Sequence, residues 1–332
     1  MGAMNGLKKF GLVVSVGLFG PLFLLSVSAY AFNRTVGNEN YVKKTVKQAK
    51  LYDAASQALV DSALGADDPN PIIKSALQTA AGPKTIEKVL DPAITSTYAW
   101  LGGGVAKPDY TLSLTQIRVS FEKSLTSKLK ARAKKLPACA YYGQSASNDI
   151  FSATCIPAGT DVDQVISDAV SRITTNADIF SDKAVADGSV DAKDAKDAGI
   201  NLPTDSPAPI IAKSYQFFKK GFPFFVIGTI IAAIGTLLLS STLLYGFRKL
   251  GILLLTNGLV LLVSGLVLQF VLGSLVPTTA ISSTEAPVNA LQEAAKILIA
   301  DNASILKTVG ISSVIAGLAA TITSTALIRK KQ

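Results

Sequence analysis

Four apolar runs with basic residues at their ends constrain this chain more than any other feature of its sequence. Each run has about the 20 residues that a helix needs to cross the hydrocarbon core of a bilayer. The runs occupy residues 10–32, 222–247, 250–276 and 308–328. The basic residues beside them are Lys8, Lys9, Arg248, Lys249, Arg329, Lys330 and Lys331. This pattern predicts a chain that crosses a membrane four times.

The positions of these basic residues also predict an orientation. If the chain crosses the membrane at every run, all of them fall on one side, and short loops rich in lysine and arginine stay in the cytoplasm. We therefore expect an all-α, multi-pass protein of the cell membrane with both termini cytoplasmic and a large helical extracytoplasmic domain between spans one and two. Besides the spans, the predicted segments are 1–9 (cytoplasmic), 33–221 (extracytoplasmic domain), 248–249 (cytoplasmic turn), 277–307 (outer amphipathic segment) and 329–332 (cytoplasmic tail).

The first run has an alternative reading as a cleavable signal peptide. Lys8 and Lys9 could form its basic region, and Ala29-Tyr30-Ala31 fits the small-x-small rule for cleavage. The apolar stretch at 10–32 is, however, longer than the roughly 7–15 residues of a signal-peptide core. A retained anchor is therefore the favoured interpretation, and cleavage after Ala31 remains the alternative.

The composition argues against several classes of protein. The chain has no histidine, which excludes catalytic triads, metal sites and proton relays that need imidazole. Its formal charge of +9 comes from 32 basic and 23 acidic residues. If the seven basic residues beside the spans are left out, 25 basic and 23 acidic residues remain. Membrane topology therefore explains most of the excess of positive charge, and no nucleic-acid partner is indicated. We predict no catalytic, cofactor-binding or metal-ligating residues, and no enzyme activity.

Helical patterns run through the predicted extracytoplasmic domain. Asn70-Pro71 and Asp91-Pro92 both resemble helix starts, with a capping side chain followed by proline. The clearest amphipathic pattern lies within 114–136, and a further helix is expected at 161–177. Within 114–136 the apolar residues recur every four positions: Ile117, Phe121, Leu125 and Leu129. A domain of this length can bury a substantial core.

The two cysteines, Cys139 and Cys155, both fall in this domain. On the oxidising side of a membrane two such thiols most simply form a disulfide, and the alternative is a pair of free thiols. Pro137 and Pro157 lie two residues outside the cysteines. Because proline resists helix continuation, the pattern predicts a disulfide-closed loop between two helices.

Charge is unevenly divided along the domain, because residues 33–136 are basic and residues 137–212 are acidic. One explanation is that the two halves pack together and neutralise each other. The other is that the basic helix contacts an anionic lipid surface or a wall polymer. The residues that would make this contact are Lys123, Lys128, Lys130, Arg132, Lys134 and Lys135.

Small and amide side chains follow a regular spacing in the last three spans, as Gly258 and Gly265 do at seven residues. The interiors of these spans carry no charge. Small residues let membrane helices approach closely, and charged ones usually mark ion or proton pathways. The candidate packing residues are Gly228, Gly235, Asn257, Gly265, Ser313 and Gly317. They could serve packing within the chain or contact with a membrane-protein partner or a second copy. Segment 277–307 is expected to dock against the large domain or to lie among the lipid headgroups.

Several of these motifs together resemble a group of uncharacterised bacterial multi-pass envelope proteins. The motifs are Leu136-Pro137-Ala-Cys139, Cys155-Ile-Pro157 and the stretch 41–59 with its Tyr52-Asp53. The resemblance implies an N-terminal anchor, a helical outer domain and closing spans, in a bacterial envelope. It implies no activity.

The leading functional hypothesis is a non-enzymatic integral envelope protein whose outer domain mediates protein or cell-envelope interactions as a subunit or scaffold. Its expected partners are the lipid bilayer and a membrane protein or a second copy. One alternative is an accessory or pore component of a channel or transporter. Another is an extracytoplasmic hydrolase without a recognisable motif.

Overall fold

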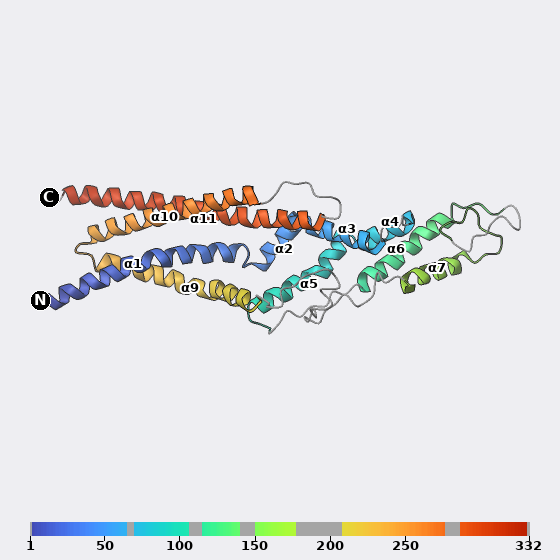
Figure 1. The fold of residues 1–332 in the computed structure, drawn as a ribbon, viewed down its shortest axis with the longest axis horizontal. Helices are drawn as coiled ribbons and strands as arrows, with labels where there is room; N and C mark the ends of the chain where they lie inside the picture. The colour runs from blue at the N-terminus through green and yellow to red at the C-terminus, as the bar shows by residue number, and fades with distance from the viewer. Residues whose placement is uncertain are drawn as a thin grey trace.

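Four long helices form one end of the molecule in the computed structural model (Figure 1). The structure describes residues 2–64, 70–105, 115–139, 150–176, 208–275 and 286–330. The long helices are α1 (Gly2–Arg34), α9 (Ala208–Leu238), α10 (Leu243–Leu275) and α11 (Ala286–Lys330). Each is long and apolar enough to cross a membrane. These helices confirm the prediction of an all-α, multi-pass membrane protein.

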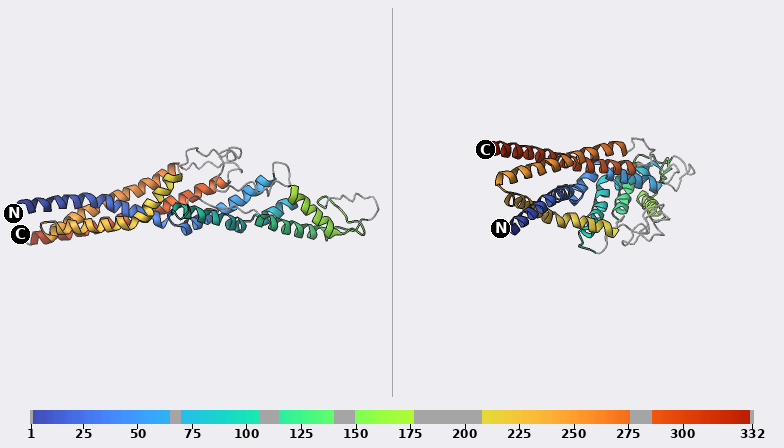
Figure 2. Two further views of the ribbon diagram at one scale, coloured as in Figure 1. Left: turned by 90° about the horizontal axis from the view of Figure 1, so that it is seen from below. Right: turned by 60° about the vertical axis from the view of Figure 1, so that its left-hand side comes forward.

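The four long helices pair as α1 with α9 and α10 with α11, and they lie side by side in further views (Figure 2). Helix α1 begins and α11 ends at the same end of the bundle (Figure 1). Both chain termini therefore lie at the end opposite to the remaining helices.

The turn between the second and third spans differs from the prediction. Helix α9 ends at Leu238 and α10 begins at Leu243, so Arg248 and Lys249 lie inside α10, and the predicted turn at 248–249 is wrong. The turn occupies residues 239–242, where the hydroxyl of Thr242 accepts a hydrogen bond from the backbone N–H of Tyr245 at 3.3 Å. Hydroxyl side chains that cap a helix favour a break at this point over continuation.

Helix α11 is one continuous helix of 45 residues, and not a separate outer segment followed by a span. Of the predicted segment 277–307, residues 277–285 lie outside the described ranges, and the rest belongs to α11. Its first half packs on α2 (Glu39–Gln48) and α3 (Leu51–Leu64), as expected for docking against the large domain. The buried side chains are Ala290, Ala294 and Ala303, whereas the larger apolar residues Val288 and Leu291 are exposed. Alanine allows closer helix approach than the larger side chains do.

The helices between α1 and α9 form what we call the head domain. Besides α2 and α3 it contains α4 (Pro71–Ala80), α5 (Pro83–Leu101), α6 (Thr115–Ala133) and α7 (Val162–Asn176). Helix α6 is central to its core, because the four apolar residues at four-residue spacing are each at most 1% exposed. They pack with Leu77 of α4 and Ile166 of α7. The amphipathic prediction for α6 is thus confirmed.

Of the two helix starts predicted from a capping residue followed by proline, the structure contains one. Asn70 accepts a hydrogen bond from the N–H of Ile72 at 2.9 Å, and Pro71 is the first residue of α4, as predicted. The predicted start at Asp91-Pro92 is wrong, because α5 runs through it. The Asp91 carboxylate accepts a hydrogen bond from the hydroxyl of Tyr52 at 2.6 Å, so this side chain joins α5 to α3.

Candidate functional site

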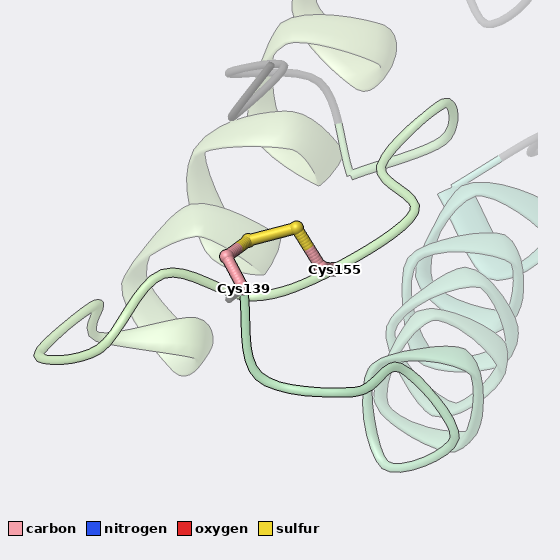
Figure 3. Close-up of a disulfide and its surroundings, with 2 residues drawn as sticks. All are labelled: Cys139 and Cys155. Carbon is pink, nitrogen blue, oxygen red and sulfur yellow. A yellow bond between two sulfur atoms is a disulfide. The ribbon is translucent and has the colours of Figure 1, made fainter. Parts of the chain in front are cut away.

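The end of the head domain farthest from the spans is closed by a disulfide (Figures 1 and 3). Cys139 and Cys155 are bonded with their α-carbons 5.0 Å apart, which confirms the predicted pair. Backbone hydrogen bonds lie beside it, from the N–H of Cys139 to Ile156 (3.0 Å) and from that of Ile156 to Pro137 (2.9 Å). The disulfide therefore fixes the segment 150–160 close to the end of α6. We call this region, with α7, the tip.

A cleft of about 630 Å³ lies at the tip, between segment 150–160 and α7. This volume falls within the range of small-molecule sites, about 300–1,000 Å³. Its apolar lining comes from both sides and includes Ile150, Phe151, Ile156, Val162, Val165 and Ile173. The cleft is the main candidate for a binding site in the described part of the chain.

Helix α7 forms one wall of the cleft along an edge of its apolar face. Ile166 and Val170 are buried against the core, whereas Val165 and Ile173 are only half-buried and line the cleft. The carboxylate of Asp161 caps the helix, accepting hydrogen bonds from the N–H groups of residues 163 and 164 at 3.0 and 3.1 Å. Val165 and Ile173 also pack against this core, so they belong to the same apolar face. The part of this face that stays exposed supplies the apolar surface of the cleft.

The six basic residues predicted for an anionic contact divide into two groups. Three of them hold the head domain together: Lys128 donates to the Ser75 hydroxyl (2.8 Å), Arg132 to the Ala153 carbonyl (3.2 Å), and Lys130 pairs with Asp163 (2.9 Å). The other three are exposed: Lys123, Lys134 and Lys135. The internal contacts favour charge neutralisation within the domain. Contact with an anionic surface stays a prediction, and Lys130 is exposed as these three are.

A polar and aromatic layer joins the head domain to α9. The hydroxyl of Tyr215 in α9 donates to the Gly37 carbonyl at 3.1 Å and accepts from Lys219 at 2.7 Å. Tyr98 of α5 stacks edge-on against Tyr215 and donates to the Val36 carbonyl at 2.5 Å. Burial raises the pKa of Tyr98, so its hydroxyl stays protonated and remains a donor.

Glu39 at the start of α2 reinforces this layer. Its carboxylate accepts hydrogen bonds from the Thr95 hydroxyl at 2.6 Å and from Lys43 at 2.9 Å. The hydrogen bond from Thr95, and then the one from Lys43, lower the pKa of Glu39. These hydrogen bonds join α2 to α5 at the end of the head domain next to the four long helices, which we call the base (Figure 1).

Helix α11 is tied to the same base. Thr35, which follows α1, donates to the side-chain oxygen of Asn302 at 3.1 Å. The hydroxyl of Tyr41 in α2 donates to the carboxylate of Asp301. Burial, followed by this hydrogen bond, raises the pKa of Tyr41 to about 12. The head domain is thus fixed to α11 as well as to α9.

Glycines at seven-residue spacing bring α10 and α11 into close contact. Gly258 faces Gly310 so closely that a β-carbon on Gly258 would lie 2.9 Å from the Gly310 carbonyl oxygen. A β-carbon on Gly317 would lie 2.5 Å from the carbonyl oxygen of Gly251. We call this contact the glycine seam. Its members are Gly251, Gly258 and Gly265 in α10 and Ala303, Gly310 and Gly317 in α11.

All six predicted packing residues lie in helix contacts within the chain. Gly265, Ser313 and Gly317 lie in or beside the seam. The remaining contacts join Gly228 to Leu22, Gly235 to Ser15 and Asn257 to Gly20. The sequence reasoning missed Gly251, Ala303 and Gly310, although their seven-residue spacing in both helices could have revealed them.

The described residues contain no group of three or more acidic or cysteine side chains that could hold a metal ion. Comparisons with protein-family models, with curated proteins and with solved structures gave no match.

Proposed function

We propose that this chain is a non-enzymatic integral protein of the cell envelope that presents an interaction site on an arm of packed helices outside the cytoplasm. The observation that carries the proposal is the position of the tip cleft, at the opposite end of the molecule from the chain termini (Figure 1). The contacts of the base fix the head domain to α9 and α11. Such an arrangement suits a subunit or scaffold that holds a partner at a set distance from the membrane.

The proposed orientation places the head domain on the extracytoplasmic side. The basic residues near the chain termini support it, because positive charge is retained in the cytoplasm. The disulfide supports it too, because disulfides persist in oxidising compartments. The channel and hydrolase alternatives stay predictions, since no feature within the described ranges favours either.

We expect α1 to be retained as an anchor. Ala29 and Ala31, which would both directly precede the cleavage site, are at most 3% exposed in an unbroken helix that packs along α9. Removal of α1 would expose its partner surface on α9 to lipid. Mass spectrometry of the purified protein should find N-terminal peptides from before residue 32. A mature chain that begins at Phe32 would contradict this prediction.

The proposed interaction site can be tested by photocrosslinking in cells. A photoreactive amino acid in place of Thr160, an exposed residue of the tip cleft, should give a discrete crosslinked product with a partner or a second copy. The same amino acid in place of Gln78, exposed on α4 outside the cleft, is the matched control. Absence of a product at Thr160, or equal products at both positions, would contradict the proposal.

A further inference from the structure

The rim of the tip cleft carries two opposite charges beside its apolar wall. Asp168 and Arg172 lie one helical turn apart on α7, and both are exposed and line the cleft. Residues four apart on a helix are neighbours, with β-carbons about 6 Å apart, and often pair with each other. The structure places no ion pair between these two described side chains. Their charged groups are therefore in a position to contact a ligand.

The apolar part of the cleft lies next to these two charges. Val165, Ala169 and Ile173 follow each other at four-residue spacing on α7 and face the disulfide-bound segment, including Ile156. A ligand that matches the whole site needs an apolar part for this wall and, beside it, an anionic group for Arg172 and a cationic group for Asp168. Arginine is suited to a carboxylate, because its guanidinium offers two parallel donors.

From this arrangement we infer that the tip cleft binds a short peptide with apolar side chains and free ends. Its carboxylate would contact Arg172, its ammonium group would contact Asp168, and its side chains would lie against the apolar wall. The cleft volume of about 630 Å³ suits a ligand of two or three residues better than one amino acid. This inference rests on the proposed function, because it names the ligand class of the same site.

The test uses the full chain in lipid nanodiscs and the tripeptide Ala-Leu-Ala as the probe, with binding measured by calorimetry. Three forms of the probe separate its charges: the free peptide, the N-acetylated form and the C-terminal amide. Arg172→Gln should weaken the free and acetylated peptides about tenfold and leave the amide unaffected, because only the amide lacks the carboxylate. Asp168→Asn should weaken the free peptide and the amide about tenfold and leave the acetylated form unaffected.

The control is Lys123→Gln, which also removes one exposed charge but lies on α6 outside this cleft. It should leave the binding of all three forms unchanged. The inference is overturned if no form binds, if single amino acids bind as well as the tripeptide, or if each variant weakens all three forms equally. Should crosslinking at Thr160 still capture a partner in that case, the proposed function stands and only the ligand class fails.

Discussion

Replacing Gly317 with alanine is expected to separate α10 from α11 and to destabilise the spans. The new β-carbon would lie 2.5 Å from the carbonyl oxygen of Gly251 and 2.7 Å from the backbone nitrogen of Leu255. Both are backbone atoms, so relief requires movement of a whole helix. Overpacking of this kind costs roughly 1–3 kcal/mol. Thermal unfolding in detergent should show a midpoint several degrees below that of the unchanged protein.

The matched control is Gly17→Ala in α1. A β-carbon on Gly17 would have no atom within 4 Å, and this residue also lies in a candidate span. Alanine is favoured over glycine within a helix by roughly 0.5–1 kcal/mol, so this variant should be as stable as the unchanged protein or slightly more so. Equal midpoints for the two variants would show that the glycine seam does not hold α10 and α11 together.

Loss of the disulfide is expected to be the most damaging change in the head domain. Cys139→Ser combined with Cys155→Ser opens a loop with a sequence separation of 16 residues. In the chain-entropy account, a loop of this size contributes about 3 kcal/mol. Unfolding of the head domain by denaturant can be monitored by limited proteolysis between α6 and α7. The double variant should have a clearly lower unfolding midpoint than the unchanged protein.

A reductant provides the control for this pair of substitutions. It should lower the midpoint of the unchanged protein to a similar value and have no effect on the double variant. An unchanged midpoint in the double variant would show that the tip is held by packing alone. Thiol labelling of the protein from intact cells adds a test of location, because oxidised cysteines are expected only outside the cytoplasm.

The sequence predicted those parts of the fold that depend on local pattern. Length and apolarity were enough for the four spans, and the four-residue spacing from Ile117 to Leu129 was enough for the buried face of α6. The turn at 239–242 was missed, because a basic pair such as 248–249 is typical of a membrane boundary but does not itself end a helix. The break is marked instead by Thr242, whose hydroxyl caps the start of α10.

The candidate site was predicted only in part. The cysteine spacing and its prolines predicted the disulfide-closed loop, but the cleft depends on how segment 150–160 passes over α7. That path is set by tertiary contacts such as the hydrogen bond from Arg132 to Ala153. The same hydrogen bond explains why Arg132, which the sequence pattern assigned to an anionic surface, instead makes a contact within the head domain.

The unbroken course of α11 has a mechanical consequence. At about 1.5 Å per residue, its 45 residues make a rod about 67 Å long, which α2 and α3 contact near one end. The glycine seam packs α11 against α10 backbone to backbone, so any axial displacement of α11 that reached Arg329 and Lys330 would have to carry α10 with it.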